Sequence, residues 1–150
     1  MTSYKHTQIG YLMLGILCVV LVFFIWIYGV MTAETSIPTF TIVVMALVLF
    51  MLASFGTLTV SVDKQYVTIK FGYGIFRKRF VVSEIASAER VKNHWYYGWG
   101  IRLWLWPKMW IYNVSGFDAI EIIMRNGRIY RIGTDVPGEL ETAIKRTINP

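Results

Sequence analysis

The chain has 150 residues, of which 55% are hydrophobic and 16% are charged, and its net charge is +6. Soluble domains average about 45–50% apolar and about 25% charged residues, so this composition argues against an ordinary soluble protein. Because the apolar residues concentrate in the first third of the chain, it indicates a membrane protein with one attached domain. The roughly 90 residues after the apolar segments suffice for one small hydrophobic core but not for two.

The first apolar segment, residues 9–30, predicts a membrane-spanning helix. No Asp, Glu, Lys or Arg lies between Lys5 and Glu34, and a span needs about 20 residues. Aromatic residues near both ends fit the belts found at membrane interfaces. A cleavable signal peptide is the competing interpretation. It is disfavoured because the apolar run exceeds the roughly 7–15 residues of a signal peptide's apolar core and no small-residue cleavage site follows.

A second uncharged segment, residues 38–55, predicts another span. Ser36 is expected to cap this helix and Pro38 lies in its first turn, where a missing N–H does no harm. Gly56 is expected to end it. Because the connection between the two spans is only a few residues long, the helices must form an antiparallel hairpin. Residues 1–56 are therefore interpreted as an N-terminal tail followed by this hairpin.

The positive charges predict the orientation of the hairpin. Cytoplasmic flanks of membrane spans are enriched in Lys and Arg. The loop between the spans carries only Glu34, whereas Lys5 precedes the first span and most of the Lys and Arg residues follow the second. We therefore expect a multi-pass protein with both termini in the cytoplasm.

From residue 57 onward the apolar residues alternate with polar ones, which is the period of half-buried β-strands. A polar turn at 63–65 separates the first two runs. A weaker candidate strand lies at 85–91. The stronger candidates are residues 57–62, 66–71, 76–82, 101–106, 109–114, 119–124 and 128–132.

The last two of these strands predict a hairpin whose register depends on the turn. A two-residue turn would place Glu121 opposite Ile132 and mix the apolar and polar faces. A three-residue turn with Gly127 in the left-handed conformation pairs Ile120 with Ile132 and Glu121 with Arg131. We favour the second register because it keeps each face uniform.

The C-terminal segment returns to helical periodicity. Thr134 or Asp135 is expected to cap this helix, and Pro137 lies in its first turn. The apolar face of the helix carries Leu140, Ile144 and Ile148. Residues 57–150 are thus predicted to form about seven antiparallel strands in a small sandwich or barrel, closed by one C-terminal α-helix.

Four short segments of this domain resemble the bacterial PH (pleckstrin-homology-like) domain family. They are WYYGWGIR at 95–102, YNVSG at 112–116, RNGR at 125–128 and RIGTD at 131–135. The resemblance implies a PH-like fold attached to the inner membrane of a prokaryote. It implies no reaction, because the family has no known common chemistry. The chain departs from the family in residues 103–110, where extra tryptophans replace a more polar hairpin.

The densest basic run is Arg77-Lys78-Arg79. Beside an inner membrane, each of these side chains could attract anionic lipid headgroups with about 1 kcal/mol. The alternative is an ordinary cytoplasmic flank whose cations only follow the charge bias of membrane topology. Lys64 and Lys70 are too sparse to form a phosphoinositide pocket around the first hairpin.

Five of the six tryptophans lie between residues 95 and 110. On the strand 101–106, tryptophans share one face and leucines the other, so both faces are apolar. One of them is expected to meet lipid, the membrane helices or another protein, and some of the rings should belong to the core. Arg102 is expected to stack on a ring or to reach a phosphate or carboxylate, unless it is purely structural. The candidate contact residues are Trp95, Trp99, Arg102, Leu103, Trp104, Leu105, Trp106 and Trp110.

No residue pattern predicts an enzyme. His94, Ser115 and Asp118 are of catalytic types, but their spacing indicates no site. The single cysteine, Cys18, lies in the first span, so no cysteine-based metal site is expected. We expect no cofactor, small-molecule substrate or nucleic acid.

The expected role is that of a membrane-anchored interaction protein. It would act as an accessory subunit docking onto a membrane-protein complex, or as a homo-oligomer, at the cytoplasmic face. The alternative is a sensor of anionic lipid headgroups that uses the basic run and the tryptophan hairpin.

Overall fold

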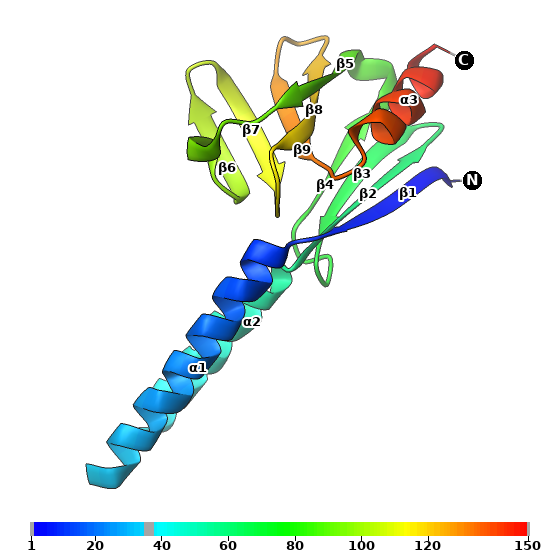
Figure 1. Ribbon diagram of the computed structural model, residues 1–150. Coiled ribbons are helices and arrows are strands. Elements are labelled where there is room, and N and C mark those ends of the chain that lie inside the picture. Colours follow the sequence, from blue (N-terminus) through cyan, green and yellow to red (C-terminus); the bar gives the residue numbers. More distant parts are fainter. Residues whose placement is uncertain (1, 35–37, 150) are drawn as a thin grey trace.

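Two apolar helices project from a domain made of two β-sheets and a third helix (Figure 1). The computed structural model describes residues 2–34 and 38–149. The helical elements are α1 (Tyr11–Glu34), α2 (Thr39–Ser54), the short 3₁₀ turns η1 (Val82–Glu84) and η2 (Trp95–Tyr97), and α3 (Pro137–Ile148). The strands are β1 (Thr2–Ile9), β2 (Thr57–Asp63), β3 (Tyr66–Phe71), β4 (Arg77–Val81), β5 (Ile85–Lys92), β6 (Gly100–Leu105), β7 (Lys108–Asn113), β8 (Asp118–Met124) and β9 (Ile129–Gly133).

The helix α1 is long and apolar enough to cross a membrane. Its 24 residues span about 36 Å, compared with about 30 Å for the hydrocarbon of a bilayer. The helix α2 has 16 residues and spans about 24 Å. It begins directly after Pro38, while the predicted cap Ser36 lies outside the described residues. Most of the apolar side chains on both helices are exposed.

The N-terminal segment is a strand of the domain, so the prediction of a tail was wrong. β1 pairs antiparallel with β2 along its length, and the N–H of Gly10 donates to the carbonyl of Gly56 at 2.8 Å. The side chains of β1 that lie opposite the buried side chains of β2 belong to Tyr4, His6 and Gln8. Because these residues are polar or amphipathic, the segment lacks the apolar alternation that identifies a strand in a sequence.

The first sheet has the order β1-β2-β3-β4 and matches the predicted strands after residue 57. Its buried side chains include Leu58, Val60 and Val62, as the alternation predicted. In the turn between β2 and β3, the Asp63 carboxylate accepts the N–H groups of Gln65 and Tyr66 at 2.8 and 2.7 Å. These two hydrogen bonds lower the pKa of Asp63.

The second sheet has the order β5-β8-β9-β7-β6. All its pairs are antiparallel except β7 with β9, which is parallel. The predicted antiparallel arrangement is therefore wrong for one pair of strands, β7 with β9. The number of strands agrees with the prediction, since the seven stronger candidates and the weaker one at 85–91 correspond to the eight strands β2–β9. The parallel pair arises because β9 folds back from β8 into the space between β8 and β7. Alternating hydrophobicity reveals strands but not the order of neighbours.

The predicted register of the β8–β9 hairpin is confirmed. Ile120 lies opposite Ile132 and Glu121 opposite Arg131, and Gly127 has a φ of 79°. The side chains of Glu121 and Arg131 also form an ion pair at 2.7 Å. The three-residue turn thus keeps the charged pair on one face and the isoleucines in the core.

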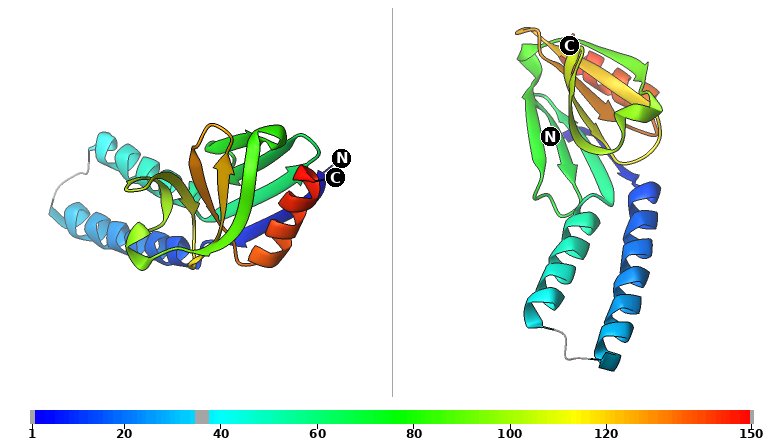
Figure 2. Two further views of the ribbon diagram at one scale, coloured as in Figure 1. Left: turned by 90° about the horizontal axis from the view of Figure 1, so that it is seen from above. Right: turned by 90° about the vertical axis from the view of Figure 1, so that its left-hand side faces the viewer.

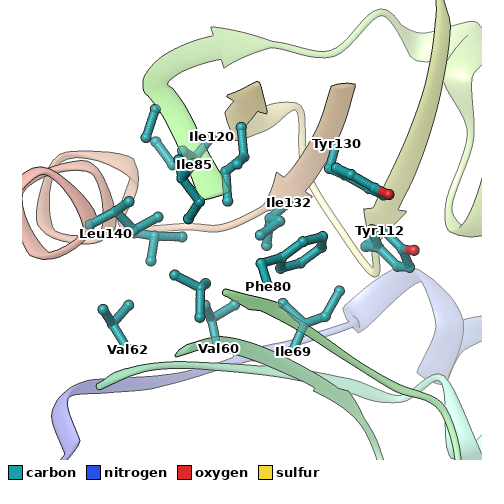
Figure 3. Packing of buried hydrophobic residues seen from close by; sticks show 14 of the residues in the cluster. Val60, Val62, Ile69, Phe80, Ile85, Tyr112, Ile120, Tyr130, Ile132 and Leu140 are labelled. Atoms are coloured by element: carbon teal, nitrogen blue, oxygen red, sulfur yellow. The ribbon is translucent and has the colours of Figure 1, made fainter. Parts of the chain in front are cut away.

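The two sheets face each other across one main hydrophobic core. Figure 3 shows Val60, Ile69 and Phe80 of the first sheet directed toward Ile120 and Ile132 of the second. The apolar face of α3 closes the core on one side. As predicted, its fully buried side chains are Leu140 and Ile144, with Ile148 packed at the margin.

The predicted cap of α3 was wrong. Val136 precedes the helix, which has Pro137 at its start and no capping hydrogen bond from a side chain. The Thr134 hydroxyl accepts the N–H of Val136, and the Asp135 carboxylate lies 2.6 Å from Nε2 of His6 on β1. Both predicted capping groups are therefore engaged outside the helix.

Both apolar helices leave the domain at the same end (Figures 1 and 2). Gly10 and Gly56 join α1 and α2 to the sheet, and a Cβ added at Gly10 would lie 3.0 Å from the Cβ of Val114 after β7. We call this the helix end of the domain. Since β7 runs toward it over Lys108–Asn113, the turn before β7 lies about 20 Å away, at the far end.

We predict that Gly72→Ala destabilises the protein more than Gly127→Ala does. Both glycines have positive φ, which costs alanine about 1–2 kcal/mol. A Cβ at Gly127 would meet open space, whereas one at Gly72 would meet the backbone of Ser54 on α2, which adds about 1–3 kcal/mol of overpacking. Thermal unfolding in detergent would measure the difference. Equal losses of stability in the two variants would show that the β3–β4 turn does not pack against α2.

Candidate interaction surfaces

The β6–β7 hairpin has apolar side chains on both faces, as predicted, but the rest of the chain covers only one face well. On that face, Met109 and Ile111 are 1% exposed and form a small second core with Tyr97. Trp104 and Ile129 pack against the margin of this core. The η2 segment, Trp95–Tyr97, therefore covers one face of the hairpin, and we call it the lid.

Aromatic contacts hold this lid in place. The ring of Trp104 lies 4.9 Å from that of Tyr97 and 5.6 Å from that of Tyr96. His94 stacks on Tyr96 with ring centroids 4.9 Å apart. The indole N–H of Trp104 donates to the carbonyl of Trp106 at 2.8 Å. These contacts give Trp104 and His94 structural roles.

The opposite face of the hairpin is only partly covered. Near the helix end, Ile101 lies opposite Tyr112 and both belong to the main core or its margin. One step further along the strands, Leu103 lies opposite Trp110, and these side chains are 42% and 38% exposed. The exposed residues of the hairpin, which we call the hairpin apolar surface, are Leu103 (42%), Leu105 (68%), Trp106 (89%) and Trp110 (38%).

Cationic side chains border the hairpin apolar surface. Lys108 is exposed on the hairpin itself, and Arg128 is exposed on the adjacent β8–β9 turn. A groove of about 470 Å³ runs between the β6–β7 hairpin and the β8–β9 turn. It is lined in part by Leu103, Lys108, Trp110 and Arg128. Residues 94–116 contain no Asp or Glu. The surface is thus apolar with a positively charged rim.

The remaining predicted contact residues lie apart from this surface. Trp95 is 75% exposed on the lid. Trp99 packs on Phe117 with ring centroids 6.3 Å apart, and its indole nitrogen is buried without a hydrogen bond. Nε of Arg102 donates to the carbonyl of Trp99 at 3.2 Å. In this region the guanidinium of Arg131, and not that of Arg102, lies over an aromatic ring, 5.5 Å from the centre of Tyr97.

The structure distributes the basic run over two faces of β4. Arg77 and Arg79 point away from the core, and the guanidinium of Arg79 lies 5.9 Å from the centre of the Tyr66 ring. Lys78 lies opposite Ile69 on the other face, and Arg77 and Lys78 both line a crevice of about 220 Å³ whose wall includes Tyr112. Burial, with a smaller contribution from neighbouring Tyr130, raises the pKa of Tyr112 to about 12, so its hydroxyl is neutral. The three cations do not form one patch.

Within residues 2–34 and 38–149, no three His, Cys, Asp or Glu side chains gather as a metal site would require. Cys18 is exposed on α1.

Sequence reasoning missed the turn between β3 and β4 as a contact element. Tyr73 in this turn stacks on Phe50 of α2, with ring centroids 5.4 Å apart, and Phe76 stacks on Phe55 at 5.1 Å. The signal available in the sequence was a pair of large apolar side chains, Tyr73 and Ile75, in a turn that contains two glycines.

Comparisons of the chain with protein-family models, curated proteins and solved structures found no match.

We predict that Trp104→Ala and Trp106→Ala affect stability very differently. Trp104→Ala removes a ring from the second core and should lower the free energy of unfolding by about 2–3 kcal/mol, somewhat less than for a fully buried tryptophan. Trp106→Ala removes a ring that is 89% exposed and should change stability by less than about 0.5 kcal/mol. Thermal unfolding of the two variants would measure this, and similar losses would refute the assignment of the two faces.

Proposed function

We propose that α1 and α2 cross the inner membrane of a prokaryote as a hairpin, with β1 and the sheet domain in the cytoplasm. The apolar side chains of both helices project from the domain without cover from the described residues, and a bilayer would bury them. The pairing of β1 with β2 supports an integral hairpin, because removal of α1 as a signal peptide would also remove a strand of the sheet. A 16-residue α2 is accommodated by local thinning or polar flanks.

We also propose that the domain is a distant PH-like domain. Two facing sheets closed by a C-terminal helix support this relationship, and the segments at 95–102 and 131–135 add the sequence resemblance. The parallel β7–β9 pair is a departure from the proposed relationship.

The function that this geometry supports best is docking onto a protein partner at the cytoplasmic face of the membrane. The observation that carries it is the position of the hairpin apolar surface. Trp106, 89% exposed, lies at the far end of the domain, about 20 Å of strand away from the helices. At that distance it meets neither the lipid nor α1 and α2. An exposed aromatic cluster at such a place is typical of a protein interface.

The rim of the surface defines the chemistry of the partner. Lys108 and Arg128 border the apolar side chains, and residues 94–116 carry no acid. The partner surface should therefore present apolar side chains flanked by carboxylates. We propose an accessory, non-enzymatic subunit of a membrane-protein complex as the role of the chain.

We predict that Trp106→Ala and Lys108→Glu each weaken the association with this partner at least tenfold. A central aromatic residue of an interface typically contributes 2 kcal/mol or more, equivalent to about 30-fold in affinity. The measurement is photo-crosslinking in native membranes from a benzoyl-phenylalanine at Leu105, followed by purification of the crosslinked species in mild detergent. Val81→Ser, on an exposed apolar residue of β4, is the matched control and should leave crosslinking unchanged.

Two outcomes would contradict the proposal. One is a chain that gives no discrete crosslink from Leu105 and remains monomeric in mild detergent. The other is a crosslink that survives both hairpin variants unchanged. Crosslinking between differently tagged copies of the chain would identify the partner as a second copy.

A further inference from the structure

The outward face of the first sheet is positively charged and rich in hydroxyl groups. The outward positions are those that alternate with the buried Leu58, Val60, Ile69 and Phe71. The cations on this face are Lys5, Lys70, Arg77 and Arg79, and its hydroxyl residues include Thr7, Thr59, Ser61 and Thr68. The acid on the described part of this face, Asp63, lies at the far end and is bound to the turn there.

Two of these cations face each other directly. Lys70 on β3 lies opposite Arg77 on β4 in the register of the sheet. Like charges in this position destabilise a sheet. None of the ion pairs formed among residues 2–34 and 38–149 includes either residue. Arg79 differs, because its guanidinium lies over the Tyr66 ring. An anion held between Lys70 and Arg77 would relieve their repulsion and accept hydrogen bonds from both.

This pair of cations lies beside the end of α2. It directly precedes and follows the β3–β4 turn, in which Gly72 packs on the backbone of Ser54 and Tyr73 stacks on Phe50. Figure 1 shows this turn reaching toward the helices. Phe50 lies one helical turn, about 6 Å, inside the end of α2. The tip of the turn therefore reaches the level of the last turn of the proposed span.

The turn also carries the side chains that a membrane interface accepts. Tyr73 is 65% exposed and Ile75 is 56% exposed. A Cβ added at Gly74 would lie 2.8 Å from Cε of Lys70, so the aliphatic stem of Lys70 runs along the turn. Lysine in such a position keeps its stem against apolar groups and its ammonium among polar headgroups.

We infer that Lys70 and Arg77 bind the phosphate of an anionic phospholipid of the cytoplasmic leaflet, while Tyr73 and Ile75 enter the bilayer interface. The inference rests on the proposed crossing of the membrane by α1 and α2, and it is independent of the protein partner. The occupant is a lipid and not a soluble phosphate, because the site is continuous with the membrane helix through Tyr73 and Phe50. The site differs from the basic run as a whole, because Lys78 lies opposite the buried Ile69, on the other face of β4 from Arg77.

The test is the binding of short-chain phosphatidylglycerol to the full chain in detergent, measured by native mass spectrometry. Phosphatidylcholine and glycerol phosphate are the comparison ligands. We expect the double variant Lys70→Gln/Arg77→Gln to bind phosphatidylglycerol about 30-fold more weakly, which corresponds to about 1 kcal/mol for each cation. Tyr73→Ser/Ile75→Ser should weaken both phospholipids. Lys70→Arg/Arg77→Lys keeps both charges and should retain binding.

Lys64→Gln/Arg79→Gln is the matched control. It removes the same charge from the same sheet further from the helices, and it should retain phosphatidylglycerol binding. Three results would overturn the inference: equal losses in the double variant and the control, equal binding of phosphatidylglycerol and phosphatidylcholine by the unmodified chain, or binding of glycerol phosphate as tight as that of the lipid. None of these results depends on the hairpin apolar surface. Failure of the lipid inference therefore does not contradict the proposed protein partner, and failure of the proposed partner does not contradict the lipid inference.

Discussion

The pairing of β1 with β2 is the constraint on which the rest of the structure depends. It joins the segment before α1 to the segment after α2, and it continues to the hydrogen bond from Gly10 to Gly56 at the base of the helices. Both helices must therefore enter and leave at one end of the domain. The same pairing places His6 beside Asp135 and Gln8 beside the carbonyl of Ser115, so it also ties β1 to the segments that directly follow β9 and β7 of the second sheet.

Because both helices leave at the helix end, the position of each surface along the domain sets its distance from the proposed membrane. The β3–β4 turn lies against α2, and the Lys70–Arg77 pair lies directly behind it. The β6–β7 turn, with Trp106, lies at the opposite end. The Lys70–Arg77 pair and the exposed Trp106 are thus separated in space. Under the proposals above, lipid meets the first and a protein partner meets the second.

The sequence was sufficient to predict most elements and one register. Alternating hydrophobicity located the strands from residue 57 onward. The need to keep the apolar and polar faces separate favoured the Glu121–Arg131 register that the structure confirms. It could not reveal β1, because the inward side chains of that strand are His6, Gln8 and the amphipathic Tyr4. It could not reveal the parallel β7–β9 pair either, since the order of strands depends on long-range packing and not on local periodicity.

The candidate site was predictable only in part. The apolar character of both faces of the β6–β7 hairpin follows from its sequence, and it led to Leu103, Leu105 and Trp106. Which face is covered depends on where η2 folds, and only the structure places Tyr97 over Trp104. The pairing of Lys70 with Arg77 could not be predicted, because the two residues are seven positions apart in the chain and lie opposite each other only in the register of β3 and β4.

The most direct test of this account is a disulfide between β1 and β2. The hydroxyl oxygens of Thr7 and Thr59 lie 2.9 Å apart, and cross-strand neighbours have the Cα separation that a disulfide requires. In a Cys18→Ala background, Thr7→Cys/Thr59→Cys should oxidise within one chain in native membranes. Thr7→Cys/Thr68→Cys, which joins β1 to the next strand over, should stay reduced. A reduced first pair, or one that crosslinks only between chains, would contradict the pairing that organises the whole structure.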